Sequence, residues 1–343
     1  MGVSEAIHFD NVDELSWSFR NSKKACAWLA GLYLVRKSFR LGSLVLSAFP
    51  WICLLSDLHP GIELINHTSM HAFVVVCLAL PIAVLVREYL VSVPLAVAFL
   101  LLFGQLQPLN LISNNSTPNA TFENTVSVVS WNMLATNENF DGLRNLLQEH
   151  TPDLVVLIEL RPGVLERTEC ILEQYPHYRY RPSWGGEGIG IFSRHPNIEF
   201  EFEDFGFAKQ PALVASISNA DGASLRLVGM HTLSPLPLER VATRDKQLKE
   251  LAAWAQHTDG PIAVCGDFNI SPWTTPFKNL LAAGFVDSRE GSGNGASWPA
   301  ELGFLGVPID HVLSHGDCQI RNRKVLGPVE GSDHKPVYFE VQF

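Results

Sequence analysis

The chain has 343 residues, enough for one large α/β domain and a smaller appendage. Hydrophobic residues make up 47% of it and charged residues only 17%, which suggests that some segment lies in lipid. The net charge is −10, and the part after Asn124 is also acidic, by about nine charges. This charge disfavours tight, sequence-independent DNA binding, because such binders usually present a basic surface.

The six cysteines of the chain do not form a metal-binding pattern, because none has the CxxC or a similar zinc-site spacing. They are Cys26, Cys53, Cys77, Cys170, Cys265 and Cys318. Three lie in the apolar N-terminal region and three follow it, so no disulfide framework is apparent, although one pair could form after export. We expect buried free thiols.

Three apolar runs near the lower length limit for a membrane-spanning helix precede residue 107. They are Leu41–Ser56, His71–Val86 and Tyr89–Phe103. Only Arg87 and Glu88 separate the last two runs, as in a tight turn between antiparallel membrane helices. A shorter run, Ala25–Val35, has basic flanks and is predicted to lie at the membrane interface. The alternative is that these runs are core helices of a soluble domain.

Basic residues predict which side of the membrane each part occupies. Lys and Arg cluster before Leu41 and recur at Arg87, whereas Asp57–Ser69 has none, so residues 1–40 and Arg87 are predicted to be cytoplasmic. Three transmembrane helices over residues 41–106 then put the rest of the chain outside a plasma or inner membrane. Residues 107–124 are rich in Asn, Ser, Thr and Pro and predict a linker to a separate domain over residues 125–343.

Polar side chains follow predicted buried strands at several points after residue 125. Asn132 ends one β-branched run, and Glu159 follows the run Leu154–Ile158. His231 follows Leu225–Met230, just before a loop interrupted by proline. Strand ends are where α/β proteins assemble their sites, although each residue alone is as easily a surface or structural one.

The segment Ile262–Asn269 carries the most information about chemistry. A buried strand leads into Gly266-Asp267-Phe268-Asn269, and the alternation of side chains aims Asp267 and Asn269 the same way. A carboxylate can orient a water and an amide can donate to a phosphate oxygen, so the pair suits a phosphoryl site. The alternative is an Asx-type turn that only ends the strand.

The preceding stretch, Leu238–Gln256, predicts an amphipathic helix. Its apolar face consists of Leu248, Leu251, Ala252 and Ala255. Arg240, Arg244 and Lys249 point toward the opposite face. We therefore expect these three basic side chains on the polar side of the helix.

Two acidic residues and a histidine near the C-terminus complete the polar series. Asp310 lies in Ile309-Asp310-His311, and Asp333 and His334 precede the predicted strand Val337–Val341. A hydrogen bond between His334 and Asp310 would fix the tautomer of the imidazole and favour its protonated form. Asp333 adds a candidate metal ligand.

In this order the motifs resemble the endonuclease/exonuclease/phosphatase (DNase I-like) superfamily, over nearly all of residues 126–343. The matching motifs are Trp131-Asn132, Glu159, Gly188–Ser193, His231, Gly266-Asp267-Phe268-Asn269, Ile309-Asp310-His311 and Ser332-Asp333-His334. The resemblance implies an α/β (α+β) fold, a four-layer α-β-β-α sandwich with two central mixed sheets, here preceded by the helical transmembrane region. It also implies a Mg²⁺-dependent site, with Mn²⁺ as an alternative metal.

The same resemblance implies a role for each matching residue. The implied metal-site residues are Asn132, Glu159 and Asp333, and the implied catalytic residues are His231, Asp267, Asn269, Asp310 and His334. Asp267 would orient or deprotonate the attacking water, while Asn269 and His231 would contact the phosphate. His334, held by Asp310, would stabilise the pentacovalent oxygens and remains an alternative base.

Three functions remain open, because this kind of site cleaves several classes of phosphoester. The first is a membrane-anchored hydrolase of a lipid-linked phosphate or pyrophosphate, whose partners are the bilayer and the substrate. The second is an extracytoplasmic endonuclease or exonuclease, although no basic stripe with interleaved aromatic residues is present. The third is a non-catalytic membrane binding module, which the complete set of acidic and histidine positions disfavours. Trp184, Trp273 and Trp298 are expected in core or rim packing, with a substrate cleft as the alternative.

Overall fold

The computed structural model describes residues 12–106, 124–168, 173–218, 222–289 and 295–343, with side chains from residue 26 onward. Most of the predicted linker 107–124 and Cys170 lie outside the described residues. The chain divides into two compact units. Met1–Pro50 and Ala72–Leu101 form the first, and Trp51–His71 and Leu102–Phe343 form the second.

The first unit is built from three helices, of which α1 spans Val12–Cys53, α3 spans Ser69–Leu85 and α4 spans Tyr89–Leu106. Helix α1 contains both the predicted interfacial run, Ala25–Val35, and most of the predicted membrane run Leu41–Ser56. The two are continuous because residues 36–40 contain no Pro or Gly that would break a helix. The turn at Arg87 and Glu88 between α3 and α4 lies where the sequence predicted it.

Helix α4 is long and apolar enough to cross a membrane by itself. Helix α3 meets the same criterion together with the preceding helix α2 (Pro60–Asn66), across a bend of 52°. The described residues therefore contain one candidate span, or two if the bent pair crosses as one. The first predicted crossing, Leu41–Ser56, is not among these candidates, and the apolar stretch between Arg40 and Asp57 is short.

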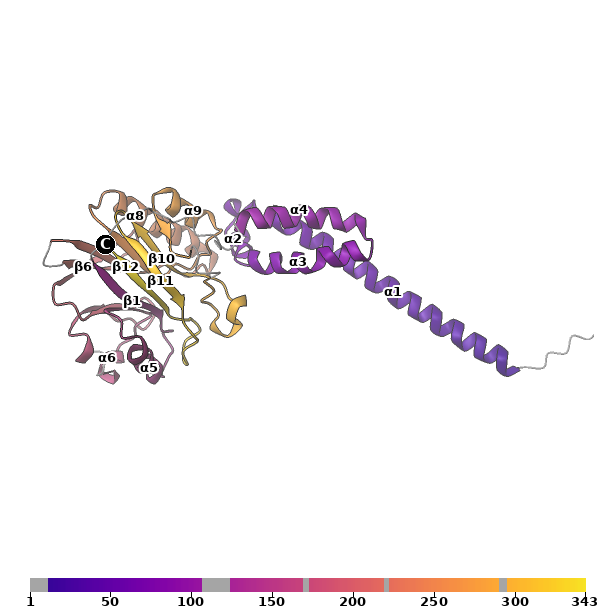
Figure 1. Ribbon diagram of the computed structural model, residues 1–343, viewed down its shortest axis with the longest axis horizontal. Coiled ribbons are helices and arrows are strands. Elements are labelled where there is room, and N and C mark those ends of the chain that lie inside the picture. The colour runs from indigo at the N-terminus through magenta and orange to yellow at the C-terminus, as the bar shows by residue number, and fades with distance from the viewer. Residues whose placement is uncertain (1–11, 107–123, 169–172, 219–221, 290–294) are drawn as a thin grey trace, which may run out of the picture. The chain divides into compact units, whose positions relative to one another are not determined.

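The second unit contains two six-stranded sheets, and Figure 1 labels strands of both. The first sheet has the order β11 (Gln319–Val325), β12 (Val337–Gln342), β1 (Thr125–Asn132), β2 (Leu154–Ile158), β4 (Ile189–Ser193), β3 (His177–Arg181). The second has the order β5 (Ile198–Glu203), β6 (Ala212–Ser218), β7 (Ser224–His231), β8 (Ile262–Asp267), β10 (Asp310–His315), β9 (Val286–Asp287). Both sheets are mixed, because β1–β2 and β7–β8 are parallel and their other neighbours are antiparallel.

Helices cover the outer face of each sheet, and the two inner faces pack on each other. Helices α5 (Asp141–His150) and α6 (Val164–Arg167) pack on the first sheet, and α8 (Val241–Gln256) and α9 (Thr275–Ala282) on the second, as Figure 1 shows. A third apolar cluster joins residues of both sheets between them. The predicted four-layer α-β-β-α fold is thereby confirmed.

The topology explains why polar side chains from distant parts of the sequence meet. Strands β1, β2, β7 and β8 carry Asn132, Glu159, His231 and Asp267 at or directly after their carboxyl ends. In the sheet registers Asn132 lies opposite Ile158, and His231 lies opposite Asp267. The antiparallel strand β10 begins with Asp310 directly opposite Asp267, so its first residue reaches the same edge.

One basic side chain of the predicted amphipathic helix does not lie where the sequence suggested. Arg244 of α8 was expected on the polar face, but it is fully buried. Its Nη2 donates to both carboxylate oxygens of Glu63, at 2.7 and 2.9 Å. Glu63 belongs to α2, which follows the short helix η1 (Ser56–Leu58) and lies in the same compact unit. The expectation was wrong because this partner lies 181 residues away in the sequence.

The described cysteines are free thiols, as the sequence predicted, but they are not all buried. Cys53, Cys265 and Cys318 are buried and Cys77 is half-buried, whereas Cys26 is exposed on α1. The sequence therefore predicted correctly that the described cysteines are free thiols, but it did not predict that Cys26 is exposed.

Candidate active site

A cavity of about 1070 Å³ lies at the edge of the sandwich where the strand ends meet. The catalytic and metal-site candidates that line it are Glu159, His231, Asp267, Asn269 and His334. Asn132 and Asp310 lie directly behind this surface, where each is hydrogen-bonded to one of the lining residues. Seven of the eight residues singled out from the sequence thus belong to one neighbourhood.

Asn132 links the carboxylates of Glu159 and Asp267. Its Nδ2 donates to Oε1 of Glu159 at 3.0 Å and to Oδ2 of Asp267 at 3.1 Å. Its Oδ1 accepts from the backbone N–H of Leu134, which fixes the orientation of the amide. Glu159 follows β2 with a positive φ of 60°, and its second oxygen accepts from the N–H of Ala135 at 2.8 Å. The amide of Asn132 therefore bridges the two carboxylates.

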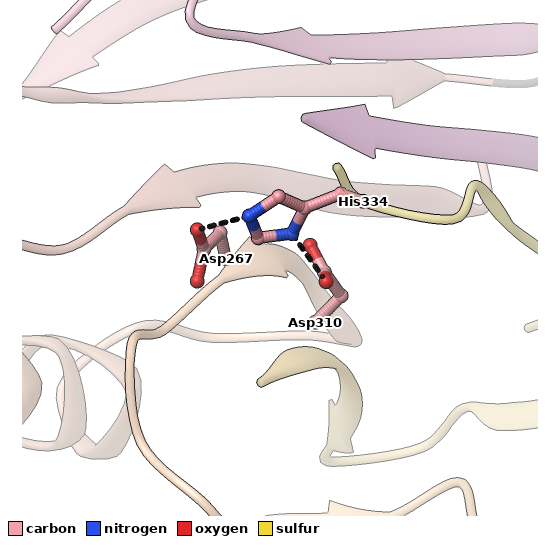
Figure 2. Close-up of side chains that lie close together, drawn as sticks. All are labelled: Asp267, Asp310 and His334. Atoms are coloured by element: carbon pink, nitrogen blue, oxygen red, sulfur yellow. Dashed lines mark hydrogen bonds and ion pairs between the residues drawn. The ribbon is translucent and has the colours of Figure 1, made fainter. Parts of the chain in front are cut away.

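His334 lies between two buried carboxylates, as Figure 2 shows. Its Nδ1 lies 2.8 Å from Oδ2 of Asp310, and its Nε2 lies 3.6 Å from Oδ2 of Asp267. The backbone of His334 is also fixed, because its N–H donates to Oγ of Ser332 and its carbonyl accepts from Nε1 of Trp131. The ring is thus positioned before any substrate arrives.

The surroundings decide which of these groups carries a proton. Burial alone would lower the pKa of His334, but the carboxylates of Asp310 and Asp267 outweigh it and raise that pKa to about 10. Burial pushes the pKa of Asp310 upward, yet His334 and the hydrogen bonds to it and to Ser297 lower it overall. Burial raises the pKa of Asp267 above its ordinary value. At neutral pH His334 is therefore an imidazolium, and Asp267 is the more basic of the two carboxylates.

His231 faces the same two carboxylates that Asn132 connects. Its Nε2 lies 3.7 Å from Oδ2 of Asp267 and 4.0 Å from Oε1 of Glu159. Its Nδ1 lies 3.1 Å from the carbonyl oxygen of Gly186, which can only accept, so Nδ1 carries a hydrogen. The remaining nitrogen is directed toward the cavity, where it can hold or donate a proton.

Asn269 combines the two alternatives that the sequence left open. Its backbone N–H donates to Oδ1 of Asp267 at 2.9 Å, which is an Asx-type turn, and its φ is 51°. The same turn places Asn269 on the cavity wall, where Nδ2 donates to the carbonyl of Thr232 at 3.0 Å. The turn therefore positions the amide.

Asp333 is the candidate that stands apart from the others. Its Oδ2 accepts from Nε1 of Trp298 at 2.8 Å, and its Oδ1 is buried without a hydrogen-bond partner in the described part of the chain. No hydrogen bond between described residues joins this carboxylate to Asn132 or Glu159. Its charge contributes to the raised pKa of His334, and Trp298 connects it to the cavity wall.

The donor set fits a divalent cation with a preference for oxygen. Glu159 and Asp267 present carboxylate oxygens to the cavity beside one amide, and Mg²⁺ commonly takes one or two carboxylates with water and phosphate. Asp267, Asp310 and His334 also have ligand atoms within 4.8 Å of one another. Both ring nitrogens of His334 already face carboxylates, however, so this buried group suits proton transfer better than metal ligation.

Ser332 supports the site, although the sequence identified it only as part of a motif and gave it no role. Ser332 accepts from the N–H of His334 and donates to the carbonyl of Asn132 at 2.7 Å, which connects two of the motifs. Its place two residues before His334 was the only signal in the sequence. Trp184 and Trp298 line the cavity, whereas Trp273 is buried in the core.

The family model described as the Endonuclease/Exonuclease/phosphatase family matches residues 129–334. The chain belongs to this family. All three activities in the family's name cleave phosphoester bonds, so the chain is a phosphoester hydrolase, and enzymes of this family typically depend on a divalent metal. The matched residues include every site candidate described above.

Solved structures of the family share the fold at low sequence identity. A humanized D. rerio TDP2 is 22% identical, with a TM-score of 0.55, over 64% of this chain and 99% of its own. The 3' phosphatase NExo from Neisseria, bound to a product DNA hairpin, is 20% identical with a TM-score of 0.51, over 64% and 100% of the two chains. The human Nocturnin catalytic domain with a bound sulfate anion is 17% identical with a TM-score of 0.50, over 64% and 94%. No curated protein matches the chain at a significant level.

Proposed function

We propose that this protein is a membrane-anchored, Mg²⁺-dependent hydrolase that cleaves a lipid-linked phosphate or pyrophosphate. The observation that carries the proposal is the cavity where Glu159 and Asp267 share one amide and His334 lies between Asp267 and Asp310. At this cavity Asp267 can accept a proton from water, His334 is a cationic donor, and Glu159 offers oxygen ligands for a metal. Those are the groups that hydrolysis of a phosphoester requires.

The protonation states assign the steps to particular side chains. Asp267 is the acceptor that orients the attacking water and takes its proton, because its pKa is raised and its carboxylate faces the cavity. His334 enters as the imidazolium, held by Asp310, and stabilises the negative charge that develops on the phosphoryl oxygens. His231 and Asn269 line the cavity with nitrogen donors and bind the phosphate.

Glu159 and Asn132 would hold the metal, with Asp333 as the third ligand that the resemblance implies. Bound Mg²⁺ would polarise the phosphoryl group and make a coordinated water more acidic. For Asn132 to offer an oxygen, its amide would have to turn, because Nδ2 now faces both carboxylates and Oδ1 accepts from Leu134. Glu159 needs no such change, since its carboxylate already lines the cavity.

The membrane part of the proposal rests on apolar surface that water would not favour. Large apolar side chains are exposed along both α3 and α4. They include Val75, Leu78, Ile82, Val84, Leu85, Leu90, Val93 and Leu100. Helix α4 alone has the length and hydropathy of a span. Lipid tails around these helices would cover the exposed side chains.

The orientation follows from where the basic side chains gather within the helical unit. Arg36 and Arg40 of α1 both pair with the buried Glu88, which lies in the turn between α3 and α4 next to Arg87. Basic residues of α1 and of this turn therefore share one end of the unit, and the positive-inside rule makes that end cytoplasmic. Because α4 runs away from this turn, the hydrolase domain that follows it lies on the extracytoplasmic side.

A nuclease is the second candidate, favoured by two aromatic side chains. Trp184, with an exposed fraction of 73%, and Trp298 both line the cavity, where bases could stack on them. Two of the similar structures, D. rerio TDP2 and NExo, were solved with DNA products. The domain of this chain is acidic, which weakens binding to a polyanion. We therefore rank a lipid-linked substrate first.

The test is a substrate panel with the full-length chain in detergent micelles. Release of phosphate or nucleotides is measured with Mg²⁺ and with EDTA on DNA, RNA, phospholipids and polyprenyl pyrophosphate. The matched variants are Asp267→Asn and Asp287→Asn, which each remove a buried carboxylate, but Asp287 pairs with Arg289 and does not line the cavity. Lipid hydrolysis that needs Mg²⁺ and is lost only in Asp267→Asn supports the proposal. Nucleic acid cleaved far faster than any lipid would favour the nuclease.

A further inference from the structure

A segment outside the matched family region forms part of the hydrolase unit. Helix α2 precedes the match at residue 129 by more than sixty residues, yet it belongs to the same compact unit as the sandwich. Its Glu63 is buried and accepts two hydrogen bonds from the fully buried Arg244 of α8. A buried ion pair with both partners present fixes the two helices in register.

Two further contacts hold the residues that follow Glu63. The carbonyl of Asn66 accepts from the indole Nε1 of the buried Trp273, and a ring nitrogen of His71 lies 2.5 Å from the carbonyl oxygen of Leu305. Arg244 also donates from Nη1 to the carbonyl of Asn269, at 3.4 Å. Arg244, which binds α2 through Glu63, therefore also contacts the turn at Asn269, the candidate phosphate-binding residue.

The anchored segment contributes directly to the active-site cavity. Leu64, His67 and Thr68 line the same 1070 Å³ enclosure as Glu159 and Asp267. We call these three residues the α2 wall. None of them is acidic or a permanent cation, whereas Glu63, the charged residue of α2, faces Arg244 instead.

Other uncharged side chains also line the cavity, among them Leu233, Leu236, Trp298, Val307 and Ile309. The charged side chains Glu187, Lys209, Glu239 and Arg240 line it as well. The cavity is also much larger than a phosphate group requires, which leaves space for an organic group beside it. In the chain the α2 wall ends one residue before the apolar helix α3 begins at Ser69. The wall is therefore continuous with the segment that the proposed anchor places at the membrane.

We propose that the α2 wall binds the organic group of the substrate and selects phosphoesters of an uncharged, apolar alcohol. This inference rests on the proposed function, because it assumes that the phosphate lies at Asp267 and His334. It adds the substrate class and the residues that recognise it. Recognition would be provided by apolar contact with Leu64 and neutral hydrogen-bonding side chains at His67 and Thr68, whereas the cationic side chains of the cavity lining, Lys209 and Arg240, lie outside this wall.

The test compares a phosphonate with an apolar chain to one without. Binding of n-hexylphosphonate and methylphosphonate to the full-length chain is measured by calorimetry with Mg²⁺, because neither carbon–phosphorus bond is a hydrolysable ester. We expect wild type to bind the hexyl compound about tenfold more tightly or better, since added methylene groups become buried. Leu64→Trp, which fills the space, and Leu64→Ser, which removes the apolar contact, should each weaken hexyl binding about fivefold or more and leave methylphosphonate unchanged.

The neighbouring Ile65 supplies the matched control, because its side chain is 42% exposed and does not line the cavity. Ile65→Trp should bind both phosphonates as wild type does. Unchanged hexyl binding in both Leu64 variants overturns the inference, as does equal binding of the two phosphonates by wild type. In either case methylphosphonate binding leaves the proposed hydrolase intact. Failure of wild type to bind either compound overturns the proposed phosphoester site together with the inference.

Discussion

Replacing Asp310 by Asn tests whether a carboxylate keeps His334 protonated. The pKa of His334 is raised from 6.5 to about 10, which corresponds to about 5 kcal/mol of preference for the imidazolium. Asp310 is the largest source of this preference, through its charge and its hydrogen bond of 2.8 Å, while burial opposes it. In Asp310→Asn the pKa of His334 should fall by more than one unit, and His334 should be neutral through much of the range above pH 8.

Two measurements on this variant check the reasoning. Histidine NMR over a pH titration reports the pKa of His334, and the pH above which the rate of phosphoester hydrolysis falls should move downward together with that pKa. Asp287→Asn is the control, because Asp287 is equally buried but pairs with Arg289. A His334 pKa that is the same in wild type and Asp310→Asn would refute this explanation of the charge. Equal loss of activity in Asp287→Asn would show that the effect comes from stability alone.

Three further predictions concern the fold around the site. Gly266→Ala should lower the free energy of unfolding by about 3 kcal/mol, measured in urea, because Gly266 has φ of 139° and a Cβ there would meet the carbonyl of Met230. Glu63→Gln should cost about 1 to 3 kcal/mol in the same assay, since it removes one of the two carboxylates that pair with the buried Arg244 and leaves only Asp245. The folded-state pKa of His334 lies above the value of 6.5 expected when unfolded, so its contribution to stability is complete below pH 6.5 and is lost toward pH 10. In metal-free buffer the Tm of wild type should therefore fall relative to His334→Gln between pH 7 and 10, and a constant difference would contradict it.

The sequence predicted the strands that carry the site because each is a buried apolar run with a polar residue at its end. Asn132, Glu159, His231 and Asp267 all follow such runs, and the parallel pairs bring those ends to one edge. The edge strands β3, β5 and β11 were not predicted. Their charged residues, such as those of the β11 sequence QIRNRKV, obscure the apolar signal and are typical of strands with one side unpaired.

Features that depend on contacts between distant residues could not be predicted from local patterns. The side chain of Arg244 falls on the polar face of an isolated helix, and its burial depends on Glu63 of α2, which joins the neighbouring Asp245 in pairing with the guanidinium. The contribution of His67 to the cavity has the same origin, since the turn after α2 is held by Trp273. For Asp333, the resemblance implied a metal ligand, while the structure places its carboxylate against Trp298.

We propose that the oxygen ligands at this cavity bind a divalent cation that phosphoester hydrolysis requires. The Mg²⁺ dependence of the hydrolysis rate tests this binding directly. The full-length chain is stripped with EDTA and titrated with Mg²⁺, in parallel with Glu159→Gln, whose carboxylate lines the cavity and accepts from Asn132 and Ala135. We predict no hydrolysis in EDTA, recovery with Mg²⁺, and a requirement for about tenfold more Mg²⁺ or higher in Glu159→Gln. Full hydrolysis in EDTA, or the same Mg²⁺ requirement in both proteins, would contradict the account.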